Sequence, residues 1–250
     1  MSLVTIITPA FNSERTIEEA IQSVLDQTFV DWQLIVVVDL GTVDSTLAIV
    51  DRYAAQDPRI SRIHITNGRG LALSRNAGMA AVKSRYVAFL DADDTWLPQK
   101  LELQLAALSR TKSAICCTAY CRMSEDGSRL GHALGVPRVI RYSDLLKYDY
   151  VGMSTAMVDL DQTGKFEMKE QLMEDYLVWL SLTKAGHRCV GINSVQMHWR
   201  VSDTSRSNSK AKQIRMKWQV LRHDESLGLF RALWSMTAYA LTGLLRYSRF

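Results

Sequence analysis

The fold of this 250-residue chain is decided by the stretch Phe89-Leu-Asp-Ala-Asp-Asp-Thr-Trp-Leu-Pro-Gln-Lys-Leu101. It starts within the apolar run 86–90, which has the composition of a buried strand, and turns acidic at Asp91. Asp91 and Asp93 are two positions apart, so their side chains leave an extended backbone on the same side. Paired carboxylates at a strand end can hold Mg²⁺ or Mn²⁺, because these hard cations prefer oxygen ligands and share them with substrate phosphates.

The same acidic segment has a second interpretation that needs no metal. It can be an acidic turn in which Asp94 caps the helix that follows Pro98. D-x-D-D is a short motif, and short motifs recur by chance, so the segment by itself leaves both interpretations open.

Outward from this stretch, apolar runs alternate with segments of helical period. We expect strands at 3–7, 34–38, 60–65 and 86–90, and helices at 17–25, 44–55 and 71–82. Thr16 and Glu19 have the spacing of a capping box at the start of the first helix. The alternation predicts an α/β fold with a mostly parallel sheet and helices on both faces.

The second half of the chain is less regular. We expect a strand at 113–120, helices at 142–147, 174–184, 212–222 and 227–246, and a mobile polar loop at 201–212. The chain is therefore expected to hold one α/β domain over 1–209 and a C-terminal helical extension over 210–250.

The composition is that of an ordinary soluble globular protein, with 47% hydrophobic and 22% charged residues. The four cysteines (Cys116, Cys117, Cys121 and Cys189) form no C-x-x-C pair, so we expect free, buried or partly buried thiols in a reducing cytoplasm rather than zinc ligands or disulfides. The N-terminus lacks a basic segment followed by a long apolar run, so no signal peptide is expected.

Several segments together carry a resemblance to a known family. They are Val4-Thr-Ile-Ile-Thr-Pro-Ala-Phe-Asn12, Ile21-Gln-Ser-Val-Leu-Asp-Gln-Thr28, Ser74-Arg-Asn-Ala-Gly78, the stretch 89–101, and Glu174-Asp175. In this order they resemble the motifs of the family 2 glycosyltransferases, which are inverting, nucleotide-sugar-dependent enzymes of the GT-A fold. The matches span residues 3 to about 200, so the resemblance implies a nucleotide half at about 1–110 and an acceptor half at about 111–209.

The resemblance implies roles for the residues at the strand ends, where open α/β sheets bind ligands. Thr8, Pro9 and Phe11 would lie along the nucleotide base, and Asp39 would accept a hydrogen bond from it. Arg75 would lie near the diphosphate and Asp91 would contact the nucleotide. Asp93, together with Asp91, would hold Mn²⁺ or Mg²⁺.

Asp175 matches the family's catalytic base, and a position in the first turn of a helix favours an ionised carboxylate. We expect an exposed carboxylate there, which would contribute to catalysis more through its position than through its basicity. Without the family, Glu174 and Asp175 would be plain charges at a helix N-terminus. Glu174, His198 and Arg200 are candidate phosphate or acceptor contacts, and the alternative for the last two is a strand with an exposed arginine.

Two departures from the family pattern stand near the predicted nucleotide site. Asp39-Leu-Gly-Thr-Val-Asp44 replaces the usual D-D-G-S-x-D, so Leu40 is either a replaced acid or a one-residue insertion and bears on nucleotide preference. Arg69-Gly70 replaces the usual G-G and bears on the loop that faces the sugar.

The expected reaction moves a sugar from a nucleotide-sugar to a hydroxyl of a glycan or lipid-linked acceptor, in cell-surface polysaccharide synthesis. UDP-sugars are the first expected donors, and dTDP- and GDP-sugars are the next.

One alternative is a sugar-nucleotide pyrophosphorylase, although Pro9-Ala-Phe-Asn-Ser13 is not the Gly-rich basic loop that such an enzyme would need. Another is a non-catalytic sugar-nucleotide-binding module, which Leu40 permits and Asp93 and Asp175 argue against. The missing G-x-G-x-x-G disfavours a dehydrogenase, and the charge pattern disfavours nucleic-acid binding.

The C-terminal extension 210–250 holds eight Lys/Arg and two Asp/Glu, a net charge of +6 in a chain whose total is +4. Apolar positions recur at helical spacing: Leu227, Phe230, Trp234, Leu241 and Leu245. Basic residues lie around them: Lys210, Lys212, Arg215, Lys217, Arg231, Arg246 and Arg249. The apolar run is too interrupted to span a bilayer. The pattern fits a helix on the cytoplasmic membrane surface, or helices packed on the domain or on a second subunit of a homodimer.

Overall fold

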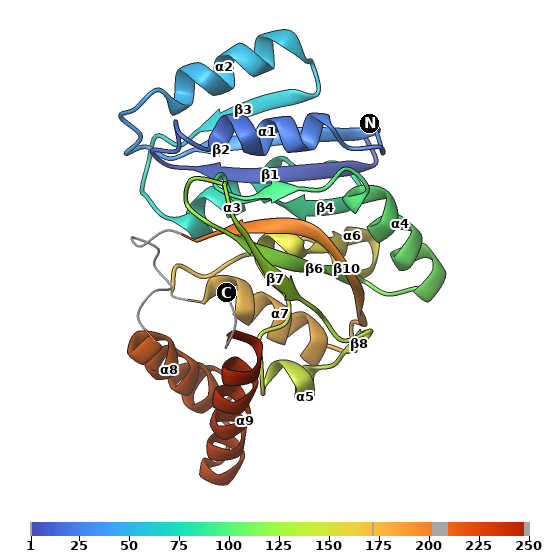
Figure 1. Ribbon diagram of the computed structural model, residues 1–250, viewed down its shortest axis with the longest axis vertical. Helices are drawn as coiled ribbons and strands as arrows, with labels where there is room; N and C mark the ends of the chain where they lie inside the picture. Colours follow the sequence, from blue (N-terminus) through green and yellow to red (C-terminus); the bar gives the residue numbers. More distant parts are fainter. Residues whose placement is uncertain (1, 172, 202–209, 248–250) are drawn as a thin grey trace.

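A mixed β-sheet forms the centre of the protein in the computed structural model, which describes residues 2–171, 173–201 and 210–247 (Figure 1). The strands of the described residues are β1 Val4–Ala10, β2 Trp32–Val38, β3 Ile60–His64, β4 Tyr86–Phe89, β5 Thr95–Trp96, β6 Ile115–Met123, β7 Leu130–Leu134, β8 Val139–Ile140, β9 Met157–Asp159 and β10 Cys189–Arg200. Their order is β3-β2-β1-β4-β9-β6-β10-β5, with β7 paired to β6 and β8 to β10.

The predicted parallel arrangement is confirmed for the first half of the chain. β3, β2, β1 and β4 run parallel, in the pairings expected of successive β-α units. β9 then lies antiparallel between β4 and β6, and β6 pairs parallel with β10. The carboxyl ends of β1, β2, β4, β6 and β10 therefore meet along one edge of the sheet.

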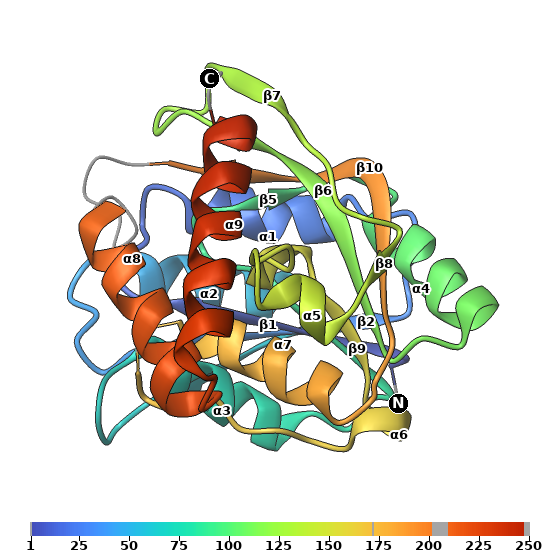
Figure 2. The same ribbon diagram turned by 90° about the horizontal axis from the view of Figure 1, so that it is seen from below.

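Helices cover both faces of the sheet (Figures 1 and 2). They are α1 Ile17–Leu25, α2 Thr46–Gln56, α3 Leu71–Ala81, α4 Lys100–Thr111, α5 Tyr142–Leu145, α6 Leu160–Thr163, α7 Glu174–Lys184, α8 Lys210–Gln219 and α9 Leu229–Tyr247, with a 3₁₀ turn at Met153–Thr155 and a π-helical turn at Val220–Asp224. Most of the predicted helices and strands are present, with ends shifted by a few residues.

Side chains of the central strands alternate between two hydrophobic cores, because successive residues of a strand point to opposite faces. Ile6, Val36 and Ala88 pack in the core that includes α1 and α4. Ile7 and Phe89 pack in the other core, with α3 and α7. Burial on both faces explains why these strands are continuous apolar runs rather than alternating ones.

The glycine of the Ser74-Arg-Asn-Ala-Gly78 segment allows α3 to lie close to the sheet. A Cβ on Gly78 would come 2.6 Å from Cγ2 of Ile7 on β1, which is closer than real carbon atoms approach. This close approach brings Arg75, on the same helix, toward the ends of the central strands.

The predicted capping box at the start of α1 is wrong. The Thr16 side chain makes no capping hydrogen bond, and Glu19 forms an ion pair with Arg200 of β10 instead. The ion pair replaces the cap because a buried arginine without a countercharge costs more free energy than a helix end without a side-chain cap.

The C-terminal helices pack against the domain, with α8 and α9 side by side next to α5 and α7 (Figure 2). Val220 and Leu221 are buried, and the rings of Tyr148 and Tyr239 stack with centroids 5.9 Å apart. Glu225 accepts hydrogen bonds from Lys184, at 2.7 Å, and from a tyrosine of α5. One face of the C-terminal extension is therefore packed on the domain, which is one of the two arrangements expected from the sequence.

Parts of the sequence expectations fall outside the described residues. The predicted mobile loop 201–212 lies mostly there, since only 202–209 separate β10 from α8. So do the side chains of Lys210, Leu245, Arg246 and Arg249.

Within the described part of the chain, none of the helices combines the length and apolar character needed to cross a bilayer. The expectation of free thiols is confirmed, with Cys121 partly buried and the other three cysteines buried.

Candidate active site

A buried arginine on α3 joins two of the predicted motifs. Arg75 is only 2% exposed, and its guanidinium lies 2.6 Å from Oδ1 of Asp91 and 3.0 Å from Oε1 of Glu174. Burial disfavours the arginine charge, but Asp91, Asp175 and Glu174 together raise the pKa of Arg75 above its usual value. The arginine is therefore a permanent cation between the acidic strand end and the first turn of α7.

The acidic segment after β4 forms a tight turn anchored by buried polar groups. The backbone N–H of Asp94 donates to the carbonyl of Asp91, and the N–H of Asp91 donates to the Ser154 hydroxyl at 3.0 Å. Asp94 is buried, and its Oδ1 accepts the backbone N–H of Arg200 at 3.1 Å. The alternative that Asp94 caps the next helix is wrong, because α4 begins only after Gln99.

The residues of this turn fit a divalent cation. Burial, followed by the charge of Asp91, raises the pKa of Asp93 to about 6. Within the described residues Asp93 has no salt-bridge partner, so a cation would relieve the repulsion between the two carboxylates. The described part of the chain gathers no group of three or more ligating side chains, so a metal here would need further oxygens, such as those of a diphosphate.

Asp175 lies in the first turn of α7, as predicted, but in a different environment. Its carboxyl is partly buried rather than exposed, and Oδ1 accepts the backbone N–H of Tyr176 at 2.8 Å. Burial and then the charge of Glu174 raise the pKa of Asp175 to about 6, while Arg75 opposes this rise. A carboxylate with a raised pKa is a stronger general base at neutral pH than an ordinary one.

The predicted nucleotide residues lie at the ends of β1 and β2. Thr8 and Pro9 are buried within β1, while the Phe11 ring is 51% exposed just beyond the strand. Asp39 is buried, and its two oxygens accept the backbone N–H groups of Gly41 and Gly70, each at 3.0 Å. Asp39 therefore ties together the two loops that border this edge.

The two departures from the family pattern meet beside Phe11. A Cβ built on Gly41 would lie 2.7 Å from Cζ of Arg69 and 3.0 Å from Cε2 of Phe11. The Arg69 guanidinium therefore rests on the Gly41 backbone next to the exposed ring, and neighbouring Leu40 is exposed.

Arg200 and His198 end the long strand β10. Arg200 is buried, so the alternative of an exposed arginine is wrong. Its Nε donates to the Asp93 carbonyl at 2.9 Å, and its other nitrogens contact the Glu125 carbonyl and the Glu19 carboxylate. His198 is half-buried where β10 pairs with β5 and β6, and burial lowers its pKa.

Comparison with known proteins assigns the chain to a family. Residues 5–158 match the family model described as Glycosyl transferase family 2. The chain belongs to glycosyltransferase family 2. It is a glycosyltransferase, as the resemblance implied.

Two relatives align with nearly the whole glycosyltransferase. A Bacillus subtilis (strain 168) protein assigned by name to teichuronic acid biosynthesis, TuaG, is 36% identical over 95% of this chain and 94% of its own. The Escherichia coli UDP-Glc:alpha-D-GlcNAc-diphosphoundecaprenol beta-1,3-glucosyltransferase WfgD is 30% identical over 88% of this chain and 85% of its own.

Solved structures show that this glycosyltransferase has the GT-A fold. S. aureus TarS 1-349, in complex with UDP-GlcNAc, superposes with a TM-score of 0.70 at 17% identity, over 98% of this chain and 73% of that one. The mannosyltransferase PcManGT from Pyrobaculum calidifontis, in complex with GDP-Man and Mn²⁺, superposes with a TM-score of 0.67 at 18% identity, over 98% of this chain and 76% of that one.

Several residues that shape the site carried no signal in the sequence of this glycosyltransferase. Glu170 accepts the Leu73 N–H at 2.8 Å and so caps α3, while Asn76 makes two hydrogen bonds, each of 2.8 Å, to the backbone of Met168. Ser154, which holds Asp91, is 63 residues away from it along the chain. Such partners lie far apart in sequence, and single serines and glutamates in loops are too common to stand out.

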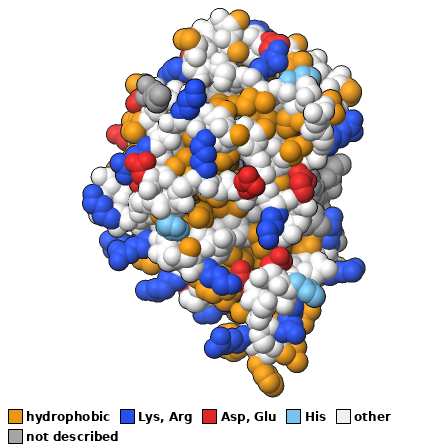
Figure 3. Space-filling model, turned by 180° about the vertical axis from the view of Figure 1, so that it is seen from behind, with side chains coloured by type: hydrophobic (Ala, Val, Ile, Leu, Met, Phe, Trp, Pro, Cys, Tyr) orange, Lys and Arg blue, Asp and Glu red, His pale blue; other side chains and the backbone are white. Residues whose placement is uncertain are grey.

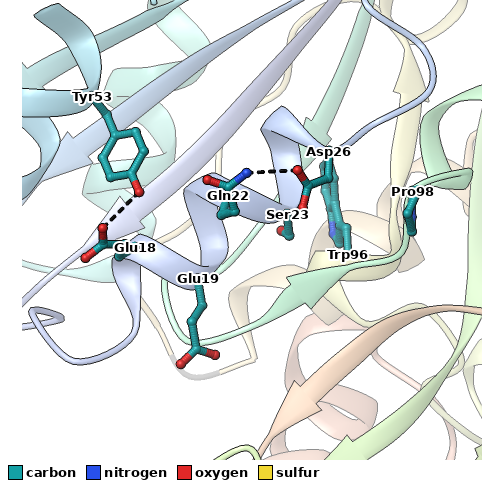
Figure 4. Close-up of a pocket in the computed structure, with 8 residues that line it drawn as sticks. All are labelled: Glu18, Glu19, Gln22, Ser23, Asp26, Tyr53, Trp96 and Pro98. Atoms are coloured by element: carbon teal, nitrogen blue, oxygen red, sulfur yellow. Dashed lines mark hydrogen bonds between the residues drawn. The ribbon is translucent and has the colours of Figure 1, made fainter. Parts of the chain in front are cut away.

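Two open cavities of the glycosyltransferase lie on the α1 side of the site. One, of about 470 Å³, holds Glu18, Glu19, Asp26 and Tyr53 beside Trp96, and contains none of the predicted nucleotide residues (Figure 4). The other, of about 560 Å³, has Arg200 in its wall together with Arg15 and Arg129. Neither cavity is lined by the predicted nucleotide residues, which lie at the strand ends.

Proposed function

We propose that this glycosyltransferase transfers a sugar, with inversion, from a UDP-sugar to a hydroxyl of a lipid-linked glycan in cell-surface polysaccharide synthesis. The observation that carries the proposal is the pairing of Arg75 with both Asp91 and Glu174. It brings the strand end suited to a metal and diphosphate next to Asp175, which is suited to take up a proton. An inverting transferase needs these two functions on opposite sides of one sugar.

The proposed reaction is a direct displacement at the anomeric carbon. Asp175 removes the proton from the acceptor hydroxyl as its oxygen attacks, and the nucleoside diphosphate leaves from the opposite side. Asp93 and Asp91 would hold Mn²⁺ or Mg²⁺, which, when bound, neutralises charge on the departing diphosphate. Arg75 orients the Asp91 carboxylate through their ion pair of 2.6 Å.

The nucleotide is proposed to lie along the edge formed by β1 and β2. Phe11 offers an exposed ring to the base, and Asp39, which already accepts two backbone N–H groups, has free lone pairs for a third. Thr8 and Pro9 would support the base from within β1. UDP is the first candidate nucleotide because WfgD, which aligns with most of the chain, is named for UDP-Glc. dTDP and GDP are the next candidates.

The acceptor is proposed to be a lipid-linked glycan bound by the half of the domain at about 111–209. WfgD is named for an acceptor with a diphosphoundecaprenol group, which supports a lipid carrier here. Glu174 and His198 remain candidate contacts to acceptor or phosphate. Since the nitrogens of Arg200 already contact protein groups, we assign it to holding the Asp93 turn.

A peripheral position on the cytoplasmic face of the membrane would bring the site to such an acceptor. The outer face of α9 exposes six large apolar side chains: Leu229, Phe230, Leu233, Trp234, Leu241 and Leu244. Lys212, Arg215 and Arg231 are exposed around them. Hydrophobic and basic side chains also lie together at the lower end of the molecule in Figure 3, the end that α8 and α9 form in Figure 1. This combination suits anionic lipid headgroups above an apolar layer.

One panel of experiments tests the proposal. Calorimetric titration with UDP, dTDP and GDP, each with and without Mn²⁺, should give the tightest binding for UDP with Mn²⁺. Incubation with UDP-glucose and a lipid-linked acceptor should then release UDP and extend the glycan. Release of sugar 1-phosphate with pyrophosphate would instead indicate a pyrophosphorylase. UDP binding without turnover on any acceptor would indicate a non-catalytic module.

A further inference from the structure

A lysine of the C-terminal extension is buried against Tyr176, the residue that follows the proposed catalytic base. Lys217 of α8 is 0% exposed, although its neighbours on the helix include exposed basic residues. Its Nζ donates to the Leu145 carbonyl at 3.2 Å, contacts the Tyr176 hydroxyl, and lies 3.9 Å from the centre of the Tyr176 ring. Burying an ammonium group is costly, so these contacts are needed to offset its lost hydration.

The residue that Lys217 contacts is the chain neighbour of Asp175. Tyr176 is fully buried, and its hydroxyl donates to the Leu145 carbonyl at 2.8 Å. Lysine and tyrosine thus share one carbonyl at the end of α5. The first turn of α7, which carries Asp175, is tied through this carbonyl both to α5 and to the C-terminal extension.

Charge links the same residues. Burial and then the charge of Asp175 raise the pKa of Asp149 to about 7, while Lys217 opposes this rise. Burial lowers the pKa of Lys217 to about 7, and Asp149 opposes that shift. The charged and titratable groups around the cluster are Glu174, Arg75 and Asp91 near Asp175, and Tyr176 and Tyr239 near Lys217. The charge of Lys217 therefore acts on Asp149, whose pKa is in turn raised by Asp175.

We propose that Lys217 is a positioning residue for the general base. It holds Tyr176, and with it the first turn of α7, against α5. The inference rests on the proposed role of Asp175. It also makes the C-terminal extension part of the catalytic apparatus, although the family match ends at residue 158.

The test compares Lys217→Met with Lys83→Met, which removes an exposed lysine between α3 and β4. Lys217→Met should lower kcat by about tenfold or more and leave UDP affinity unchanged, because Lys217 contacts Leu145, Tyr176 and Tyr239 rather than the proposed nucleotide residues. The charge of Lys217 acts on Asp149 rather than on Asp175, so the acidic limb of kcat should stay near pH 6. Lys83→Met should change neither kcat nor UDP affinity, and Lys217→Arg, which keeps a cationic donor beside Tyr176, should retain more turnover than Lys217→Met.

Two further variants keep the proposal testable if Lys217→Met does not fold. Tyr176→Phe removes the hydroxyl but not the charge, so kcat should fall while the acidic limb stays. Asp149→Asn replaces a carboxyl that is mostly protonated at pH 6 and keeps the contact between Lys217 and Tyr176, so kcat and the limb should both stay unchanged. An unchanged kcat in Lys217→Met, or in Tyr176→Phe if Lys217→Met does not fold, would overturn the inference. Near wild-type turnover in Asp175→Asn would show that the base assignment had failed instead.

Discussion

Arg75 and Glu174 are 99 residues apart in the chain, yet their side chains form a buried ion pair of 3.0 Å in the centre of the site. The same guanidinium holds Asp91, so one residue fixes the distance between the acidic turn and the helix that carries Asp175. Its role is structural and electrostatic at once, which makes it the first residue to test.

Arg75→Met should destabilise the fold by about 3–5 kcal/mol, because it leaves two partly buried carboxylates without their countercharge. Arg52→Met is the matched control, since it breaks the exposed pair with Glu18 and should cost about 1 kcal/mol or less. Urea denaturation monitored by circular dichroism measures both free energies of unfolding. Equal, small losses in the two variants would contradict the central role of Arg75.

Asp93→Ala should abolish sugar transfer and remove any gain in UDP affinity from Mn²⁺, because one of the two carboxylates proposed to hold the metal is lost. Asp26→Ala, which removes an exposed carboxylate on α1, is the control and should bind UDP and Mn²⁺ normally. Calorimetry with and without Mn²⁺ makes the comparison. The metal assignment would be wrong if Asp93→Ala kept near wild-type turnover.

Asp175→Asn should lower turnover by about two to four orders of magnitude, with donor affinity nearly unchanged, because shape is kept and basicity removed. Asp161→Asn changes an exposed carboxylate of α6 and should leave both quantities unchanged. Steady-state kinetics and UDP titration separate the two effects. An equal loss of donor binding in Asp175→Asn would point to a structural role for this helix end.

The pH dependence of kcat should show an acidic limb near pH 6. Burial and Glu174 raise the pKa of Asp175 to about 6, and only the ionised carboxylate can accept a proton. Activity should therefore be present above this value and fall as the pH drops through it. A limb near pH 4, the value of an ordinary aspartate, would mean that Asp175 is not the titrating base.

The full-length protein should float with anionic vesicles at low salt and float less at high salt, because headgroup attraction is screened. The double variant Phe230→Ser and Trp234→Ser should lose flotation yet fold normally, since these side chains are 87% and 68% exposed. Val43→Ser, which changes an 87% exposed apolar residue in the loop after β2, is the control.

Point variants are preferable to a chain that ends near Ser209. Removing the extension would also remove Lys217, Val220 and Leu221, which are buried against the domain. If the wild-type protein stayed in solution at low salt, the exposed face of α9 would instead be examined as a homodimer contact, by sedimentation with and without the Phe230 and Trp234 changes.

The sequence predicted those features that a single stretch of chain can encode. Apolar runs such as 34–38 and 86–90 become buried strands wherever helices cover both faces, so their periodicity alone indicated the layered α/β fold. The acidic turn at Asp91 was found because it directly follows such a strand. The order of the motifs then indicated the family, without information on any contact between them.

The partners of the polar side chains came only from the tertiary structure. Arg75 with Glu174, Arg200 with the Asp93 turn, and Lys217 with Tyr176 join elements that are distant in sequence. Apolar burial depends on a local periodic pattern, which sequence displays. A buried charge depends on which residue the packing of two distant elements brings within about 3 Å, and on how much water it excludes. For this reason the sequence placed Asp175 at the start of its helix, but only the folded chain made it a partly buried carboxyl with a raised pKa.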